Sequence, residues 1–234
     1  MKYRILLIVL FFSLSTLAQQ RPNILLILSD DHTMQTIGAY GAPYGATPNI
    51  DRLAKEGMVF NRAFVTNSIC APSRAVMLTG KHSHINGHRD NLSVFNAAQD
   101  NFGKQLQQIG YQTAWIGKWH LEAHPQGFDF WKVLPGQGDY YNPAFVNMNG
   151  NLDTVGGYAS DVITKIATHW MSKRDTQKPF CLVVGHKATH RTWMPDLQDI
   201  GAFDKVDFPV PDNFFDSYEN RAAAKHQDMS IDKT

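Results

Sequence analysis

Short apolar runs alternate along this chain with segments in which apolar residues recur every three or four positions. The continuous apolar runs, which are typical of strands, cover residues 23–29, 58–65, 111–116 and 180–184. Helical spacing covers residues 47–57, 70–78, 102–109 and 158–171. The first run, NILLILS, has no polar position before its end and therefore predicts a strand buried on both faces. The alternation predicts an α/β fold, with a mostly parallel sheet and helices on both of its faces.

Polar side chains gather where these predicted strands end. They are Asp30, Asp31, Lys118, His120, His186 and His190. Because ligands bind at the carboxyl ends of parallel strands, we expect one site there. Residues 125–157, rich in Gly, Asn, Tyr and Pro, predict a long loop of the kind that shapes a pocket.

The N-terminus has the pattern of a cleaved secretory signal. Lys2 and Arg4 precede the apolar run 5–12, and small residues lead to the polar Gln19. This pattern predicts a signal peptide over residues 1–18 and an exported, periplasmic or secreted protein with no membrane span after cleavage. A permanent anchor is the weaker interpretation, because the run is short for a bilayer.

Composition excludes several classes of protein. The 22 Lys and Arg balance 21 Asp and Glu, and 43% of residues are hydrophobic. This argues against a disordered chain and against nucleic-acid binding through a basic face. Only 2 cysteines are present, which is too few for a disulfide framework. We expect Cys70 and Cys181 not to pair, because one begins a helix and the other lies in an apolar strand.

Two short features carry candidate chemistry. The adjacent carboxylates Asp30 and Asp31 repel each other unless a cation lies between them, and oxygen ligands favour Ca²⁺ or Mg²⁺. An acidic turn in solvent is the alternative. In Cys70-Ala71-Pro72-Ser73-Arg74, Pro72 suits the first turn of a helix, which places Cys70 at an N-terminus that favours anions. The alternative for Cys70 is a small core residue.

Several segments resemble one enzyme family. CAPSR followed by Leu78-Thr79-Gly80 resembles CxPSRxxxLTG, the signature of the type I, formylglycine-dependent sulfatases. Other matching segments are Ser29-Asp30-Asp31, Thr47-Pro48-Asn49-Ile50-Asp51-Arg52-Leu53-Ala54, Gly117-Lys118-Trp119-His120-Leu121, Gly127-Phe128-Asp129 and Lys187-Ala188-Thr189-His190-Arg191. The resemblance implies the alkaline-phosphatase-like fold and covers residues 23 to about 195.

The resemblance also implies a sulfate ester hydrolase. Cys70 would be converted by a formylglycine-generating maturase to 3-oxoalanine (formylglycine), whose hydrate attacks sulfur. Arg74 and Lys118 would offset charge on the sulfuryl oxygens. His190 would protonate the departing sugar oxygen, and His120 would take the proton that releases sulfate.

The same resemblance implies a cation at this site. Asp30, Asp31 and the modified Cys70 would bind Ca²⁺ in preference to Mg²⁺. We interpret His82, His84 and His88 as loop or substrate-rim residues, because they lack the paired spacing of a zinc site.

The sequence also departs from the family pattern. No DNG or DHG segment, which would supply two further metal ligands, follows residue 195. We therefore expect residues 19–234 to be the N-terminal part of a sulfatase catalytic domain, without the small sheet subdomain and inactive alone.

The substrate implied by the resemblance is a sulfated glycan. Residues 187–195 and 139–143 look most like the branch of N-acetylglucosamine-6-sulfatases, which points to 6-O-sulfated N-acetylglucosamine in heparan- or mucin-type glycans. Two alternatives remain open. One is a phosphomonoesterase or phosphonate hydrolase of the same superfamily, and the other is an inactive remnant that binds glycan.

Overall fold

The computed structural model describes residues 21–44 and 46–226. The chain divides into two compact units, residues 1–194 and residues 195–234, which are described separately. The predicted signal peptide, residues 1–18, lies outside the described residues. Within the described ranges, no helix combines the length and the apolar character needed to cross a membrane.

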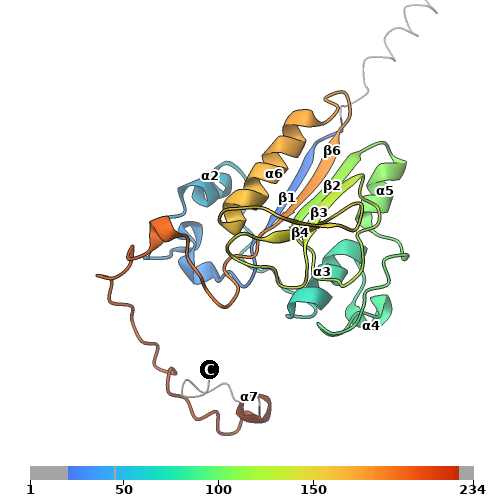
Figure 1. Cartoon of the computed structure of the whole chain (residues 1–234). Helices are drawn as coiled ribbons and strands as arrows, with labels where there is room; N and C mark the ends of the chain where they lie inside the picture. The colour runs from blue at the N-terminus through green and yellow to red at the C-terminus, as the bar shows by residue number, and fades with distance from the viewer. Residues whose placement is uncertain (1–20, 45, 227–234) are drawn as a thin grey trace, which may run out of the picture. The chain divides into compact units, whose positions relative to one another are not determined.

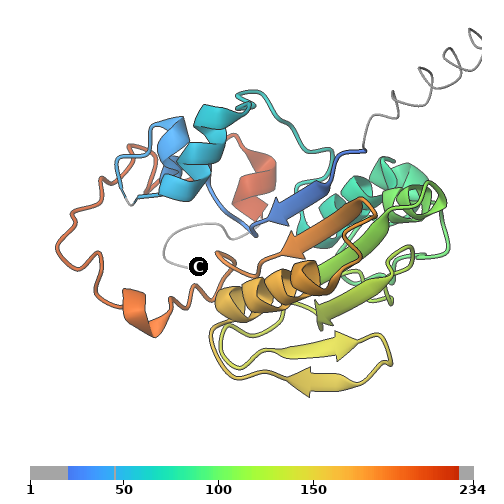
Figure 2. The same ribbon diagram turned by 90° about the horizontal axis from the view of Figure 1, so that it is seen from above.

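A six-stranded sheet forms the centre of the first unit (Figures 1 and 2). Its order is β1-β6-β2-β3-β4-β5. The strands are β1 (Ile24–Leu28), β2 (Gln112–Lys118), β3 (Phe130–Leu134), β4 (Ala144–Asn147), β5 (Leu152–Thr154) and β6 (Phe180–Gly185). The first four strands of that order pair in parallel, whereas β4 and β5 form an antiparallel hairpin at one edge. The predicted mostly parallel sheet is confirmed.

Helices cover both faces of this sheet, as predicted (Figure 2). On one side, helix α6 (Ala159–Lys173) buries Val162, Ile163 and Ala167 against the strands. On the other side lie α3 (Cys70–Thr79) and α5 (Phe102–Gln108). Successive residues of β2 alternate between the two cores, since Ile116 packs with α6 and Trp115 with α3. This alternation is the geometry of a strand between two helical layers.

Smaller helices occupy the connections of the first unit. They are η1 (Met34–Thr36), η2 (Gly38–Tyr40), α2 (Pro48–Glu56) and α4 (Ser83–Asn86). Helix α2 begins after Thr47 and ends before Gly57, as the sequence predicts. The Thr47 hydroxyl makes no helix cap. It accepts a hydrogen bond from the Gly38 amide at 2.8 Å and bonds to the Asp51 carboxylate at 2.9 Å, which ties α2 to η2.

Two predictions about secondary structure are wrong. Residues 58–65 form no strand, and Phe60 and Phe64 are largely exposed. An apolar run becomes a strand only when a neighbouring strand pairs with it, and none does so in the described part of the chain. Residues 125–157, predicted as one long loop, contain β3, β4 and β5. Glycine and asparagine at the turns between these short strands dominate the composition of the segment.

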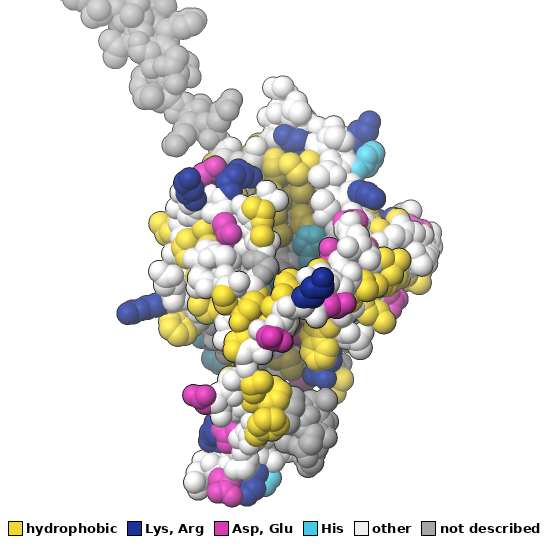
Figure 3. Space-filling view, turned by 90° about the vertical axis from the view of Figure 1, so that its left-hand side faces the viewer, with side chains coloured by type: hydrophobic (Ala, Val, Ile, Leu, Met, Phe, Trp, Pro, Cys, Tyr) yellow, Lys and Arg dark blue, Asp and Glu magenta, His cyan; other side chains and the backbone are white. Residues whose placement is uncertain are grey.

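Strand β1 differs from its prediction in burial. Leu25 is 48% exposed and Ile27 is 56% exposed, so the expectation of burial on both faces is wrong. The reason is that β1 pairs with β6 alone and is the edge strand of the described sheet. An apolar hollow of about 800 Å³ lies beside it, between β1, α3 and α5. Hydrophobic side chains are visible in a hollow on the face drawn in Figure 3.

A pair of glycines brings β2 and β6 unusually close at their carboxyl ends. Gly117 and Gly185 face each other in the parallel register. Gly117 has a φ of 92°, and a Cβ on it would lie 2.1 Å from the Gly185 carbonyl oxygen. Only glycine fits this approach. Lys118, the last residue of β2, and His186, the first residue after β6, directly follow this close approach.

The second unit is small and has little regular structure. It contains η3 (Leu197–Asp199) and α7 (Ala222–His226). An ion pair joins Asp216 to Arg221, and the Phe203 and Phe208 rings lie 6.0 Å apart. None of the predicted site residues belongs to this unit.

Candidate active site

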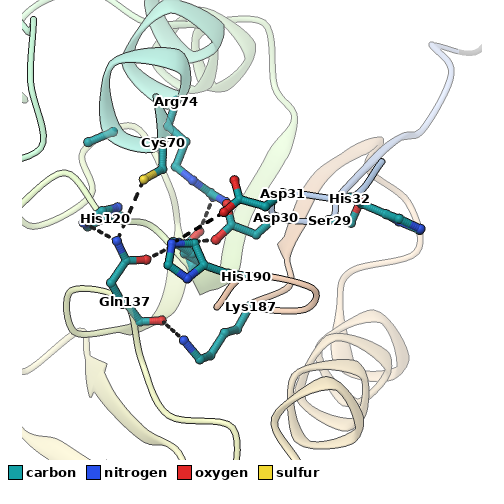
Figure 4. Close-up of polar contacts among 12 residues, drawn as sticks. Ser29, Asp30, Asp31, His32, Cys70, Arg74, His120, Gln137, Lys187 and His190 are labelled. Carbon is teal, nitrogen blue, oxygen red and sulfur yellow. Dashed lines mark hydrogen bonds and ion pairs between the residues drawn. The ribbon is translucent and has the colours of Figure 1, made fainter. Parts of the chain in front are cut away.

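The ends of β1, β2 and β6 meet at one edge of the sheet. Asp30 follows β1, and its main chain is bound to the segment after β6. Its amide donates to the Ala188 carbonyl at 2.9 Å, and its carbonyl accepts from the Thr189 amide at 2.6 Å. Lys118 is the last residue of β2. The predicted clustering of polar residues at this edge is therefore what the structure shows (Figure 4).

Cys70 is the first residue of α3, as its sequence context predicts. Asn91 holds this helix start, because its side-chain oxygen accepts from the Ala71 amide at 3.0 Å while its Nδ2 lies 3.2 Å from the Cys70 Sγ. The thiol is half-buried. Cys181 is buried in β6, and both cysteines are free, so the expectation that they do not pair is confirmed.

Asp30 is the centre of a buried charge network. Arg74 lies one turn into α3 and donates from Nη2 to Asp30 Oδ1 at 3.3 Å and from Nη1 to the Lys118 carbonyl at 2.8 Å. The Lys118 ammonium bonds to Asp30 Oδ2. All three side chains are at least nine-tenths buried. Burial lowers the pKa of Arg74 and of Lys118, and the Asp30 carboxylate opposes this shift in both.

His120 lies two residues beyond Lys118 in a left-handed conformation, with a φ of 55°. This conformation is uncommon for a residue with a side chain and often marks a functional position. Burial, followed by the positive charges of Lys118 and Arg74, lowers the pKa of His120. The imidazole is therefore neutral at pH 7 and able to accept a proton.

Asp31 and His190 form the outer part of the site. The His190 Nε2 lies 3.7 Å from Asp31 Oδ2. Asp31 has a φ of 53°, and its side chain is 61% exposed, whereas that of His190 is 12% exposed. The Tyr140 hydroxyl donates to the His190 carbonyl, which holds the histidine loop.

A cavity of about 450 Å³ opens above these groups. Its polar lining includes Asp30, Asp31, Cys70, Ser73 and Arg74. Although the whole chain has a net charge of only +1, its buried cations cluster here. Arg74 and Lys118 both pair with Asp30 beside this cavity, and buried cations of this kind can attract an anionic group.

The donor set for a metal ion is incomplete in the described residues. Asp30 and Asp31 line the same cavity as Cys70. No group of three or more acidic, histidine or cysteine side chains in the described ranges has the geometry to hold a metal. Ca²⁺ takes about six to eight oxygen ligands, so these residues would supply only part of its coordination.

Some of the predicted site residues contact one another in the structure, and others do not. Asp30, Arg74 and Lys118 form one network, and Asp31 and His190 form a separate pair. His32 points away toward Ser29 (Figure 4). His186 is buried, and its Nδ1 has no hydrogen-bond partner among the described residues.

The histidines outside the predicted site do not form a cluster. His82 and His84 stack on each other at 5.6 Å between ring centroids, whereas His88 packs edge-on against Phe95. Their interpretation as loop or substrate-rim residues stays a prediction.

Two residues at the site were not predicted as functional. Gln137 follows β3, and its amide nitrogen lies 3.5 Å from the His120 Nε2 and 3.8 Å from the Cys70 Sγ. Lys187 is buried, and its ammonium donates to the Gln137 carbonyl at 3.2 Å. The sequence signal for Gln137 was its position between two glycines after an apolar segment, which was hidden by the interpretation of residues 125–157 as a loop.

Comparison with known proteins gives a consistent result. A protein-family model described as Sulfatase matches residues 22–231. The N-acetylglucosamine-6-O-sulfatase of Bacteroides thetaiotaomicron is 50% identical over 219 residues, which is 92% of this chain and 39% of that protein. The human N-acetylgalactosamine-6-sulfatase is 33% identical over 210 residues, which covers 74% of this chain and 40% of that protein. The chain thus spans about two fifths of the length of these curated relatives.

A solved structure shows the same fold. A protein in complex with its substrate, D-glucosamine-2-N,6-O-disulfate, superposes with a TM-score of 0.84 at 50% sequence identity. The superposition covers 88% of this chain and 42% of that one.

Proposed function

Because this chain belongs to the sulfatase family, we propose that it is part of a sulfuric ester hydrolase that removes sulfate from a sulfated glycan. We further propose 6-O-sulfated N-acetylglucosamine as the sulfated unit. The support is the 50% identity to an N-acetylglucosamine-6-O-sulfatase and to a protein that binds a 6-O-sulfated glucosamine.

One observation carries this proposal. Cys70 begins a helix at a cavity lined by Asp30 and Arg74, and the buried cations Arg74 and Lys118 converge on the Asp30 carboxylate. A sulfate ester carries negative charge on its oxygens, and helix N-termini and buried cations favour such a group. This arrangement explains why Cys70 is half-buried at a polar cavity and not enclosed in the core.

Each residue of the site has a separate role in the proposed reaction. Formylglycine, formed from Cys70 by a maturase, supplies through its hydrate the hydroxyl that attacks sulfur. Arg74 and Lys118 offset the charge that grows on the sulfuryl oxygens, and their burial strengthens this effect. His120, neutral at pH 7, accepts a proton at Nε2 on the Cys70 side. His190 protonates the departing sugar oxygen, with the Asp31 carboxylate near its Nε2.

We propose Ca²⁺, in preference to Mg²⁺, as the cation at Asp30, Asp31 and position 70. The support is that these three residues line one cavity and that Asp31 is largely exposed toward solvent. With a partial ligand set we expect weak binding, with a Kd on the order of millimolar. Calcium should therefore raise the unfolding temperature of the wild-type chain and have little effect on Asp31→Asn. A matched control is Asp199→Asn, in the second unit, which should respond as the wild type does.

The first experiment tests the modification of Cys70. The full chain is produced with a formylglycine-generating maturase, and the peptide that contains Cys70 is examined by mass spectrometry. An aldehyde at this position supports the proposal. An unmodified thiol under these conditions contradicts it.

The second experiment tests the reaction class. In the whole hydrolase of which this chain is a part, hydrolysis of 4-nitrophenyl sulfate and 4-nitrophenyl phosphate is compared, followed by release of sulfate from 6-O-sulfated N-acetylglucosamine. Cys70→Ala should abolish turnover, and His190→Asn should reduce it by about 10²-fold or more. His169→Asn, at an exposed position of α6, should have no effect. A preference for the phosphate ester would refute the sulfatase assignment.

We also propose that the protein is exported to the periplasm or secreted. The support is the basic start, apolar run and small residues of positions 1–18. Production in a bacterial host followed by N-terminal sequencing of the exported fraction should give a chain that begins near Gln19. A chain that stays in the cytoplasm with residues 1–18 attached would contradict this.

A further inference from the structure

Gln137 lies in a tight turn whose backbone direction is fixed. The turn follows β3, and Gly136 and Gly138 flank Gln137 with φ of 50° and 67°. The Gly138 amide donates to the Pro135 carbonyl at 2.9 Å, and a Cβ on Gly138 would lie 2.7 Å from the Leu134 Cδ1. The positive φ of both glycines suits this tight turn, which has Gln137 at its centre.

Two buried lysines bind Gln137, one at its main chain and one at its side-chain amide. Lys187 donates to the Gln137 main-chain carbonyl at 3.2 Å, and Lys118 donates to the side-chain Oε1 at 2.5 Å. An ammonium group has donors only, so the amide oxygen and not its NH₂ group must face Lys118. The assignment of the oxygen and nitrogen of this amide is therefore fixed by chemistry.

The NH₂ end of the amide points into the site (Figure 4). It lies 3.5 Å from the His120 Nε2 and 3.8 Å from the Cys70 Sγ. Because an amide NH₂ group only donates, the His120 Nε2 must accept, and the imidazole proton must be on Nδ1. That Nδ1 is buried and has no hydrogen-bond partner in the described part of the chain, so it does not set the tautomer itself.

We propose that Gln137 is a positioning residue that keeps His120 in the tautomer with an unprotonated Nε2 facing position 70. The inference rests on the proposed function, in which His120 accepts a proton at that atom. The contact of 3.5 Å is long for a hydrogen bond. The amide can therefore leave the Nε2 lone pair when a hydroxyl at position 70 approaches it.

The tautomer of His120 can be measured without any turnover. The full chain is produced with nitrogen-isotope-labelled histidine, and long-range proton–nitrogen correlation spectra show which ring nitrogen carries the proton. His120→Asn identifies the signals of His120 by their loss. The wild-type chain at pH 7.5 should show the proton on Nδ1. A proton on Nε2 would overturn the inference.

Two variants of Gln137 test whether the direction of its amide, and not a general change in structure, sets the tautomer of His120. Gln137→Glu has the same shape, but its carboxylate can only accept, so the His120 proton should move to Nε2. Gln137→Ala should give a mixture of the two tautomers. Gln108→Glu makes the same change at an exposed position of the chain and should leave the His120 signals unchanged. An unaltered tautomer in both Gln137 variants would overturn the inference.

Turnover measured in parallel separates this inference from the proposed function. In the active protein, Gln137→Glu should lower kcat by about 10- to 100-fold with KM changed less than about threefold, because only proton transfer is affected. If the wild type has the Nδ1 proton and the variants shift it, but no sulfate ester is hydrolysed, the proposed function fails and the role of Gln137 stands. If the wild type hydrolyses sulfate esters and Gln137→Glu keeps full kcat, the role of Gln137 fails.

Discussion

The buried ion pairs around Asp30 predict that replacing Asp30 lowers the free energy of unfolding much more than replacing Lys118. The side chains of Lys118 and Arg74 are 0% and 4% exposed, and Asp30 is the carboxylate that both of them contact. Asp30→Asn leaves two buried cations without this counterion. Lys118→Met leaves one cation, Arg74, paired with one carboxylate.

The magnitudes follow from this charge balance. Removing one partner of a buried ion pair costs about 3–5 kcal/mol, which is the loss we expect for Asp30→Asn. Lys118→Met removes the hydrogen bonds of Nζ but keeps the Arg74–Asp30 pair, so we expect a loss of about 1–2 kcal/mol. In the double variant, which combines Asp30→Asn with Lys118→Met, position 118 carries no charge that needs a counterion. The loss of unfolding free energy in the double variant should be smaller than the sum of the two single losses by about 1–3 kcal/mol.

Urea unfolding of the full chain measures these free energies. Glu56→Gln, which breaks an exposed ion pair with Arg52, is the matched control and should change stability by less than about 0.5 kcal/mol. The reasoning is refuted if Asp30→Asn costs no more than Lys118→Met. It is also refuted if the two losses add within about 0.5 kcal/mol.

Three further outcomes follow from the packing. Gly117→Ala should cost more than about 3 kcal/mol in unfolding free energy, because its Cβ would meet a carbonyl of β6 at 2.1 Å. Gly87→Ala, with open space around it, should cost only about 1–2 kcal/mol for its left-handed backbone. Burial lowers the pKa of His186, so stability is highest above about pH 6.5 and falls as the unfolded chain binds a proton below it. His186→Gln should flatten this fall by up to about 1.4 kcal/mol per pH unit in urea titrations. Burial raises the pKa of Cys181 to about 11, so iodoacetamide should label unconverted Cys70 in the native chain and Cys181 only after unfolding.

The parts of the fold that depend on local sequence were predictable. Proline and glycine mark the ends of α2, and the 3.6-residue period of residues 158–171 matches α6 (Ala159–Lys173). The parts that depend on distant partners were not. The exposure of Leu25 in β1 and the absence of a strand at residues 58–65 reflect which segments pair with them, and an apolar run does not contain that information.

In the candidate site, too, the features that depend on local sequence were predictable and those that depend on distant partners were not. Cys70 and Arg74 lie one turn apart on a single helix and line one cavity, and the resemblance of the CAPSR segment had implied a shared site for them. Lys118 and His120 were placed correctly at the end of β2, although the convergence of Lys118 and Arg74 on Asp30 required the folded sheet. Gln137 lies in a turn with no charged or nucleophilic group. Its role depends on the direction of its amide, which no sequence pattern encodes.

A site of this kind also explains why its residues come from separate elements. Asp30, Cys70, Lys118 and Gln137 lie at the ends of four different elements or just beyond them, namely β1, α3, β2 and β3. Strands β2 and β3 pack into both hydrophobic cores of the sheet, whereas β1 and α3 pack into one of them. The cores therefore provide the free energy that keeps several cations buried around one carboxylate, an arrangement that is unfavourable by itself. Charge that is poorly balanced within the protein remains available to an anionic ligand, and this is the physical reason why the proposed sulfate-ester site lies beside these buried cations.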